Sequence, residues 1–515
     1  MKDYHSLIAG NWVKSSKKLP IENPANQKII GYLYDVGSQG AKKAIEAAHN
    51  AFPNWSGNTA KYRSDILKKW YSLIKKNKKE ISKIITLESG KPLKESEAEV
   101  EYGASFIEWF AEQSLRVSGE IFNSPDIKKK MMTIKQPIGV VSAITPWNFP
   151  LAMVTRKTSA ALACGCTVVL KPSELTPITS IKLAELALKA GVPPGVLNVV
   201  NGNPKIIGKS LSTHPLVKKI TFTGSTLVGK LLMRNASNTV KSVSLELGGN
   251  APFVVFDDSN LENAVNGLID SKFRNAGQTC ISANRVFVQE SVEKRFLDLL
   301  INKIESLKIG DGMKNSDIGP LINTKAILKL KSHIKDALKK GANLLCGGSV
   351  STVGELFFQP TVLSNVTSKM MAFNNENFGP LVPIITFKND ESLIKMCNDT
   401  SYGLAAYFYS QNSKRIWNIS EKLDRELVLS EEVKIHWTGC PNNCGQAHMG
   451  GIGMTGTKVK KEGGGTEDGY NVSIGGRQDH LQTLGETEFK KVSKHEIYNL
   501  IKEILINKFN AKLKT

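Results

Sequence analysis

Apolar residues recur at helical spacing in the N-terminal quarter of the chain. Ile45 and Ala48 lie about one helical turn apart, as do Ile66 and Trp70. Intervals of three to four residues place side chains on one face of an α-helix. The pattern therefore predicts helices over residues 40–115.

From residue 139 onward, short apolar runs alternate with helical patterns. The predicted strands are 139–145, 166–172, 196–202, 218–224 and 243–249. The predicted helices between them are 151–163, 177–190, 204–211 and 225–235. This alternation is typical of a parallel, doubly wound α/β sheet, and a second αβ stretch follows from Ala251 to about Leu423.

The final 93 residues differ in composition from the rest. They hold 13 of the 42 glycines, including GGIG at 450–453 and GGG at 463–465. The change predicts a separate C-terminal α+β fragment. An amphipathic helix is expected to close it, with one apolar face formed by Ile497, Leu500, Ile501, Ile504 and Leu505.

Length and composition place the chain among globular proteins. It has 515 residues, of which 41% are hydrophobic, and this length predicts roughly three to four domains. The nearest approach to a membrane span, Ile138–Val154, is interrupted by polar residues and prolines, and no secretory signal is visible. Seven cysteines are too few for a disulfide scaffold, so we expect a cytoplasmic enzyme without a membrane partner.

Basic residues outnumber acidic residues by 68 to 47, which gives a net charge of +21. A basic surface can bind nucleic acid without sequence preference. Here the excess is mostly lysine, spread along amphipathic helices rather than gathered in a tail. We therefore expect a lysine-rich solvated surface and no nucleic-acid partner.

Three residues with potential catalytic side chains lie at or beyond the ends of predicted elements. Asn148 follows the first strand, Glu246 lies near the end of the fifth, and Cys280 follows a glycine in a polar loop. Taken singly, they are most often a turn residue, a solvated charge and a buried structural thiol. Ligands of open α/β sheets bind beyond the carboxyl ends of the strands, so together these residues predict an active site.

A second group of strand-end residues suits a nucleotide. Lys171, Ser173 and Glu174 lie where the second strand ends, and Gly224 and Ser225 join the fourth strand to a helix. A tight turn into a helix N-terminus presents free backbone N–H groups that suit a pyrophosphate.

Six motifs occur in the order TPWNFP, KPSE, FTGS, LELGGN, GQTC and ENFGP. Together they resemble the aldehyde dehydrogenase superfamily over about residues 5–422, and the 34-residue step from Glu246 to Cys280 matches the family spacing. The resemblance implies an NAD(P)-binding domain with a doubly wound sheet and a catalytic αβ domain. It also implies a homodimer or homotetramer.

The resemblance assigns a role to each catalytic candidate. The Cys280 thiolate would attack an aldehyde carbonyl and later carry the acyl group as a thioester. The Asn148 amide and the backbone N–H of Cys280 would hold the oxyanion. Glu246 would activate the water that hydrolyses the thioester.

The resemblance also implies a cofactor site. Lys171 and Glu174 would hold the adenosine ribose, Glu376 the nicotinamide ribose, and Phe378 would pack beside the nicotinamide. A carboxylate near the ribose 2′ position repels a 2′-phosphate, so Glu174 favours NAD, while Ser173 and the basic surroundings could still admit NADP. The remaining cofactor-binding candidates are Trp147, Gly224 and Ser225.

Within the family, the strings NPANQK, MVTRK and FRNAGQTC are most similar to succinate-semialdehyde dehydrogenases. Arg156 and Arg274 belong to these strings, and Arg274 lies six residues before Cys280. An arginine fork suits the carboxylate at the far end of a short substrate. The alternative is that either arginine forms an internal salt bridge.

The family pattern breaks near residue 423. The string VKIHWTGCPNNCGQ and the later glycine motifs resemble the C-terminal part of ferredoxin-dependent nitrite and sulfite reductases. Cys440 and Cys444 match half of that family's iron–sulfur ligands, so neither a complete cluster nor sirohaem is expected. The upstream cysteines are expected to be buried and structural: Cys164, Cys166, Cys346 and Cys397.

Three hypotheses remain open from the sequence. The chain is a working NAD(P)-dependent aldehyde dehydrogenase with a passenger tail, a non-catalytic fusion that lacks its C-terminal segment, or a redox protein that uses the tail cysteines. The predicted domains are a nucleotide-binding domain (1–116 and 138–248), a bridging hairpin (117–137), a catalytic domain (249–422) and the reductase-like fragment (423–515).

Overall fold

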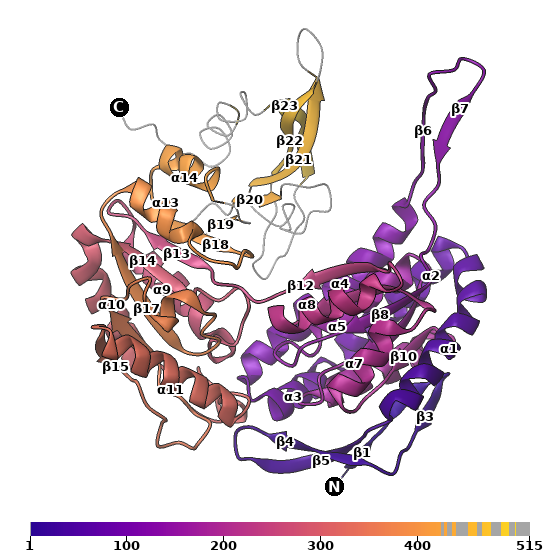
Figure 1. Ribbon diagram of the computed structural model, residues 1–515, viewed down its shortest axis with the longest axis horizontal. Coiled ribbons are helices and arrows are strands. Elements are labelled where there is room, and N and C mark those ends of the chain that lie inside the picture. The colour runs from indigo at the N-terminus through magenta and orange to yellow at the C-terminus, as the bar shows by residue number, and fades with distance from the viewer. Residues whose placement is uncertain are drawn as a thin grey trace.

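The computed structural model has two α/β units, each built around its own sheet (Figure 1). It describes residues 2–423 throughout. Beyond them it describes only residue 500 and the backbone of the strand segments 427–429, 435–438, 452–460, 466–474 and 486–493.

The first unit contains a seven-stranded sheet in the order β12-β11-β8-β9-β10-β2-β3. Five strands are parallel, and β2 joins β10 in the antiparallel direction. Their bounds are β8 Val140–Ile144, β9 Thr167–Lys171, β10 Leu197–Val199, β11 Val217–Thr223, β12 Ser242–Glu246, β2 Ser6–Ile8 and β3 Asn11–Val13. All five strands predicted from residue 139 onward are confirmed, and so is the doubly wound order. That order reverses beside β8, where ligands of such sheets bind.

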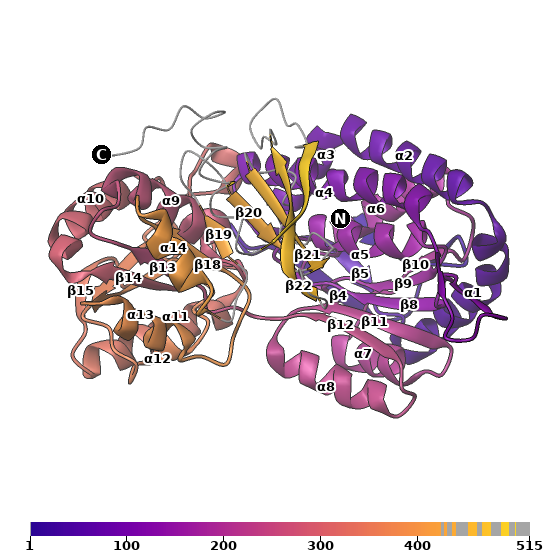
Figure 2. The same cartoon turned by 90° about the horizontal axis from the view of Figure 1, so that it is seen from above.

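Helices cover both faces of this sheet (Figure 2). One face packs mainly on α1, α7 and α8, and the other on α2 to α6. The bounds are α1 Gly37–Gly57, α2 Ala60–Lys76, α3 Lys78–Ser89, α4 Leu93–Gln113, α5 Ala152–Ala163, α6 Pro177–Ala190, α7 Pro204–Thr213 and α8 Thr226–Ser237. The helical segment predicted over residues 40–115 is thus four helices, because Thr59 caps the start of α2 and Gly90, with φ +81°, ends α3.

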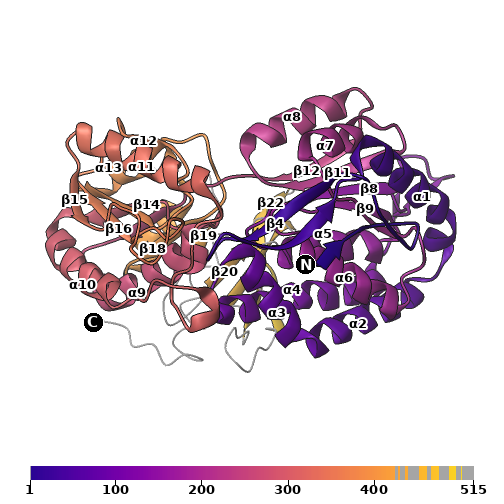
Figure 3. The same ribbon diagram turned by 90° about the horizontal axis from the view of Figure 1, so that it is seen from below.

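The second unit is built on the continuous order β15-β16-β17-β14-β13-β18. The strands are β13 Pro252–Val255, β14 Arg285–Gln289, β15 Asn343–Cys346, β16 Thr361–Ser364, β17 Leu381–Phe387 and β18 Ala406–Tyr409. The helices are α9 Leu261–Phe273, α10 Glu293–Glu305, α11 Thr324–Lys339, α12 Met371–Asn374, α13 Asp390–Asn398 and α14 Ser413–Ser420. The segment after β12 passes from the first unit into this one (Figures 2 and 3).

The same sheet continues past β18. β19 pairs with β18 in parallel, and four further strands extend the sheet at the backbone level. These are β19 Leu427–Leu429, β20 Ile435–Thr438, β21 Ile452–Lys460, β22 Thr466–Ile474 and β23 Glu486–Ser493. The chain after residue 423 therefore adds strands to the second unit.

Three features were not predicted or were predicted only in outline. A small sheet, β1-β5-β4, and the short strands β2 and β3 precede the first helix. A hairpin of β6 and β7 projects from the first unit (Figure 1), and every residue of its two strands is exposed. The bounds are β1 Lys2–Tyr4, β4 Lys18–Asn23, β5 Lys28–Tyr34, β6 Glu120–Asn123 and β7 Lys130–Thr133. The domain limits themselves stay a prediction.

The expectation that the upstream cysteines are buried is wrong for Cys164. Cys166 and Cys397 are buried, Cys346 is partly exposed, and Cys164 is exposed. Cys164 ends α5, where the chain turns outward through Gly165 at φ +87°, so its apolar sequence context does not bury it. In the part of the chain that the structure describes, no helix is long and apolar enough to span a bilayer.

Replacing Gly90 with alanine should destabilise the protein by about 1–3 kcal/mol, because Gly90 has a positive φ and little room. An added Cβ would lie 2.5 Å from Cγ of Pro320 and 2.9 Å from Cγ of Pro24. The measurement is the thermal unfolding midpoint. Gly57→Ala is the control, because Gly57 also ends a helix but a Cβ there meets nothing within 4 Å. Equal midpoints for the two variants would contradict the prediction.

Candidate active site

The loop after β8 and the loop that carries Cys280 are joined directly. The Asn148 side chain donates from Nδ2 to the carbonyl of Gln278 at 2.9 Å. Asn275 donates from its own Nδ2 to the Asn148 carbonyl at 3.1 Å. Two predicted catalytic residues, Asn148 and Cys280, therefore lie on adjacent loops, although β8 and Cys280 are far apart in sequence.

The loop before Cys280 has an unusual backbone. Asn275 and Ala276 have φ of +52° and +55°, and Gly277 follows at +77°. A Cβ on Gly277 would lie 2.2 Å from the carbonyl oxygen of Gly379, so only glycine fits there. Consecutive left-handed residues cost free energy and persist where the surrounding structure holds them. The strain therefore fixes the direction in which the chain reaches Cys280.

Cys280 is partly exposed and carries a free thiol. Burial raises its pKa to about 11, and the carboxylates of Glu376 and Glu246 act in the same direction. Backbone N–H groups of Cys280 and Ile281 oppose this increase. The structure thus brings the thiol, Glu246 and Glu376 within electrostatic reach of one another.

Glu246 ends β12, at the point where the chain leaves the first unit. Its carbonyl accepts the N–H of Gly224 at 3.0 Å, which ties it to the end of β11. Lys157 on α5 lies near the Glu246 carboxylate and donates to the Thr221 hydroxyl at 3.1 Å. Burial lowers the pKa of Lys157 to about 8, against the opposing effect of Glu246.

The two glycines after Glu246 lie against neighbouring groups, and at Gly249 there is no room for a side chain. A Cβ on Gly249 would lie 2.2 Å from the carbonyl oxygen of Cys280, and one on Gly248 would lie 3.0 Å from the Glu376 carboxylate. The N–H of Gly249 donates to Oε1 of Glu376 at 3.2 Å. The LELGGN segment therefore touches both the thiol loop and Glu376.

Trp147 and Phe378 lie on opposite sides of the junction between the units. Their rings meet edge to face, with centroids 5.7 Å apart at 82°. Phe378 has φ +53°, which is strained for an aromatic residue. The pair brings the candidate residues of TPWNFP and ENFGP together.

The predicted cofactor residues gather at the ends of β9 and β11. Lys171 is buried and donates to Glu174 at 2.7 Å. Ser173 is buried and accepts from the N–H of Leu175 at 3.2 Å. Ser225 caps α8 by accepting the N–H of Val228.

These strand ends fit a dinucleotide. The hydroxyl of Thr223, one residue before Gly224, is buried and has no hydrogen-bond partner in the described part of the chain. Beside it the N-terminus of α8 offers backbone N–H groups. Two strands along the sheet from β11, the end of β9 offers the Lys171–Glu174 pair. Phosphate and ribose oxygens are suitable partners for such groups.

Arg274 and Arg156 lie against aromatic rings. The Arg274 guanidinium is 4.9 Å from the ring centre of Phe149 and 5.4 Å from that of Tyr102. Arg156 is 5.7 Å from the ring centre of Phe106. Within residues 2–423 neither arginine has a carboxylate oxygen within 4.0 Å, so the internal salt bridge considered from sequence is not present there.

Several residues of the site escaped the sequence analysis. Lys91, Glu95 and Glu99 contact the two loops from α4 and the turn before it, and Tyr407 donates to the Ile281 carbonyl at 2.5 Å. Their signal in the sequence is weak, because charged residues on a helix are usually solvated. The complete burial of Lys91 and Glu99 is visible only in the fold.

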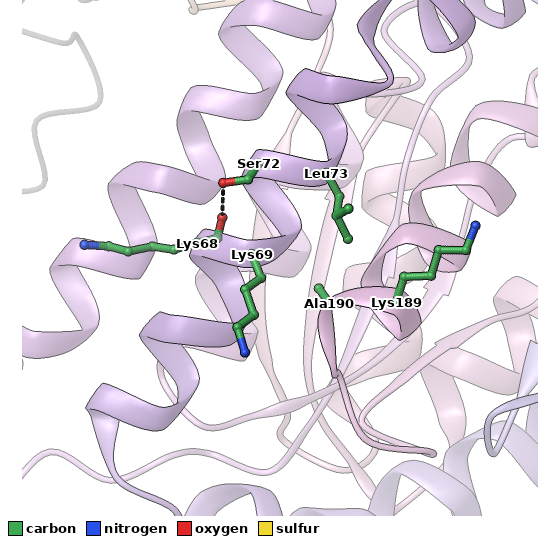
Figure 4. A pocket seen from close by; sticks show the side chains of 6 residues that line it. All are labelled: Lys68, Lys69, Ser72, Leu73, Lys189 and Ala190. Atoms are coloured by element: carbon green, nitrogen blue, oxygen red, sulfur yellow. Dashed lines mark hydrogen bonds between the residues drawn. The ribbon is translucent and has the colours of Figure 1, made fainter.

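A surface pocket of about 440 Å³ lies between α2 and α6, away from these residues (Figure 4). None of the candidate active-site residues lines it; its lining is Lys68, Lys69, Ser72, Leu73, Lys189 and Ala190. Cys440 and Cys444 lie outside the described residues. Among the described residues, no three His, Cys, Asp or Glu side chains are grouped to hold a metal ion.

Comparison with known proteins shows to which family the chain is similar. The model of the aldehyde dehydrogenase family matches residues 12–471, beyond the limit of 422 expected from the motifs. The mitochondrial succinate-semialdehyde dehydrogenase of Oryza sativa subsp. japonica is 48% identical over 455 residues, covering 88% of this chain and 86% of that protein. The NADP(+) succinate-semialdehyde dehydrogenase GabD of Escherichia coli K12 is 48% identical over 426 residues, covering 82% and 88%.

Solved structures agree with this result. The crystal structure of succinate-semialdehyde dehydrogenase from Burkholderia pseudomallei superposes with a TM-score of 0.82 at 46% identity, covering 83% of this chain and 89% of that one. A structure described as an E. coli NADP-dependent enzyme gives the same TM-score and covers 84% and 92%. The likeness thus covers most of this chain and most of each solved structure. The chain belongs to the aldehyde dehydrogenase family and is an NAD(P)-dependent oxidoreductase.

Proposed function

We propose that this chain oxidises succinic semialdehyde to succinate through a thioester on Cys280. The observation that carries the substrate class is Arg274, a cation held between two rings six residues before the thiol and free of any carboxylate within 4.0 Å in residues 2–423. Relatives named as succinate-semialdehyde dehydrogenases, at 45–49% identity, support the same substrate.

The reaction uses this chain's residues in sequence. The Cys280 thiolate adds to the aldehyde carbon, and the Asn148 amide and the Cys280 backbone N–H stabilise the resulting oxyanion. NAD(P)⁺, when bound, supplies the acceptor for the hydride that leaves the thiohemiacetal carbon. Glu246 then takes a proton from the water that attacks the thioester, which releases the acid and restores the thiol.

The two arginines give specificity for a distal carboxylate. A guanidinium binds a carboxylate through two parallel hydrogen bonds, and stacking on rings restricts its orientation. Arg274 lies on Phe149 and Tyr102, and Arg156 on Phe106, so both approach the region of the Asn148 loop. A short aldehyde with a terminal carboxylate is the matching substrate.

The cofactor choice follows from Glu174. Its carboxylate would lie beside the adenosine ribose and disfavour a 2′-phosphate, so NAD is slightly favoured. Lys171 neutralises part of that charge through its 2.7 Å contact, which weakens the discrimination. Use of NADP by a relative at 48% identity is consistent with a weak preference.

The remaining assignments concern location, assembly and the tail. The five cysteines that the structure describes are all free thiols. Free thiols are typical of proteins in a reducing compartment, so a cytoplasmic location is part of the proposal. A homodimer or homotetramer is part of the proposal, and the resemblance to the family supports it. The likeness of residues 423–515 to nitrite and sulfite reductases rests on the string around Cys440 and Cys444 and the later glycine motifs, and the family match to residue 471 overlaps them.

The purified chain should reduce NAD⁺ in the presence of succinic semialdehyde, followed by NADH absorbance. Cys280→Ala should abolish turnover, because the acyl group then has no acceptor. Arg274→Gln should lower kcat/KM for succinic semialdehyde by about 10- to 100-fold, the loss expected for one charge-assisted contact. Its kcat/KM for butanal, which has no carboxylate, should change less than threefold.

Two outcomes would count against this function. Absence of turnover from folded wild-type protein would favour the non-catalytic fusion. If Arg274→Gln lowers kcat/KM equally for succinic semialdehyde and butanal, Arg274 does not recognise the substrate carboxylate.

Alkylation of Cys280 by iodoacetamide should accelerate about tenfold for each pH unit between pH 7 and 10 in the cofactor-free protein. The thiolate is the reacting species, and the Cys280 pKa of about 11 lies above this range. Bound NAD⁺ places a positive charge near the thiol, so it should raise the rate at pH 8. Cys280→Ala supplies the background from the other cysteines. A plateau beginning near pH 8 would contradict the raised pKa.

Glu174→Gln should lower KM for NADP⁺ by about tenfold, because the repulsion of the 2′-phosphate is removed. KM for NAD⁺ should change little or rise slightly. Steady-state kinetics with both cofactors measure the ratio. Glu185→Gln is the control, since Glu185 is an exposed carboxylate on α6 paired with Lys189. An unchanged NADP⁺/NAD⁺ ratio in Glu174→Gln would exclude Glu174 as the discriminating group.

A further inference from the structure

A fully buried ion pair lies behind the Asn148 loop. Nζ of Lys91 donates to Oε2 of Glu99 at 2.6 Å, and neither side chain is exposed. Lys91 follows the glycine that ends α3, and Glu99 lies in the second turn of α4. The proposed reaction does not use either group directly.

Glu99 holds the start of α5. Its other oxygen, Oε1, accepts the backbone N–H groups of Leu151 at 2.9 Å and Ala152 at 3.1 Å. A carboxylate at a helix N-terminus satisfies donors that have no partner within the helix. The contact fixes where α5 begins, only four residues after Asn148.

Lys91 holds Asn148 itself. The same Nζ donates to the Asn148 carbonyl at 2.6 Å and lies 4.1 Å from the ring centre of Phe149. Asn148 is thus held at its carbonyl by Lys91 and Asn275, and at its amide by the Gln278 carbonyl. The amide nitrogen keeps a second N–H for an oxyanion.

The nucleophile loop is held by the same helix. Oε2 of Glu95 accepts the backbone N–H of Asn275 at 2.7 Å. Glu95 and Glu99 are one turn apart, so they lie on the same face of α4. Through these two carboxylates, α4 fixes the Asn148 loop and the Cys280 loop relative to each other.

Capping a helix does not by itself require a buried lysine. Glu88 is also fully buried and accepts two backbone N–H groups, of Ile178 and Thr179, at the start of α6. Burial raises the pKa of Glu88 to about 8, against the opposing effect of its hydrogen bonds with Thr179 and Ile178. A buried ion pair adds little stability compared with an apolar pair of the same volume. The feature that Lys91 adds is its bond to Asn148.

We propose that Lys91 and Glu99 are positioning residues that hold the Asn148 amide at the oxyanion formed on Cys280. The inference rests on the proposed thioester chemistry, in which Asn148 stabilises that oxyanion. Lys91 acts through Asn148 and touches neither substrate nor cofactor.

The test is a double-mutant cycle. It compares the wild-type chain with Lys91→Met, Asn148→Ala and the double variant, and each protein is assayed in two reactions. The reactions are aldehyde oxidation and cofactor-free hydrolysis of p-nitrophenyl acetate, which also forms an oxyanion on Cys280. Lys91→Met should lower both kcat values about tenfold or more. Iodoacetamide alkylation of Cys280 and the Kd for NAD⁺ should stay within twofold.

The cycle identifies the route of the effect. In the Asn148→Ala background, Lys91→Met should cost less than twofold more, because the group through which it acts is already absent. The proposal is overturned if the two effects multiply, or if Lys91→Met hydrolyses the ester at the wild-type rate. It is also overturned if alkylation and cofactor affinity fall in parallel with kcat, since that pattern indicates general disruption.

Two further variants keep the test independent of folding. Glu99→Gln enters the same cycle if Lys91→Met does not fold. Glu88→Gln is the matched control, because it alters an equally buried helix cap that does not contact Asn148; it should lower the melting midpoint and leave kcat within twofold. Ester hydrolysis without succinic semialdehyde turnover would contradict the proposed substrate and still allow the cycle to be read.

Discussion

The hydrogen bond from the Asn148 amide to the Gln278 carbonyl joins the two units at the candidate active site. Asn148 follows a strand of the seven-stranded sheet, and Gln278 belongs to the loop that leads to Cys280 in the second unit. Neither unit alone carries both the proposed oxyanion donor, Asn148, and the proposed nucleophile, Cys280. The relative position of the units therefore decides whether a site exists, and the buried contacts of α4 and the glycines after Glu246 fix that position.

Close approach at this junction limits which residues the chain can use. The carbonyl of Cys280 occupies the space beside Gly249, and the carbonyl of Gly379 occupies the space beside Gly277. Left-handed backbone at Asn275 and Ala276 then directs the chain into the site. Strain of this kind costs of order 1–3 kcal/mol per residue and is retained only where surrounding contacts hold it. Here the hydrogen bonds of Asn275 to Glu95 and to the Asn148 carbonyl supply such contacts.

The sequence predicted the strand-end residues because parallel strands place their carboxyl ends at one edge, so Asn148, Lys171, Gly224 and Glu246 had to lie close together. It did not predict the α4 network, because Lys91 is 57 residues from Asn148 and ordinary helix periodicity does not distinguish a buried carboxylate from a solvated one. The short strands β2 and β3 escaped for a different reason, because they have three residues each, too few for a pattern. Cys164 was misplaced because an apolar context in sequence does not say which way a helix end turns.

Burial and the neighbouring carboxyl groups together oppose ionisation of the Cys280 thiol. Burial is the largest cause of the raised pKa of Cys280, and Glu376 and Glu246 raise it further. Two buried lysines face the same carboxylates. Burial lowers the pKa of Lys272, near Glu376, to about 7 and that of Lys157, near Glu246, to about 8. Burial thus acts in opposite directions on the two kinds of group: it opposes the negative charge of the Cys280 thiolate and the positive charge of the two lysines.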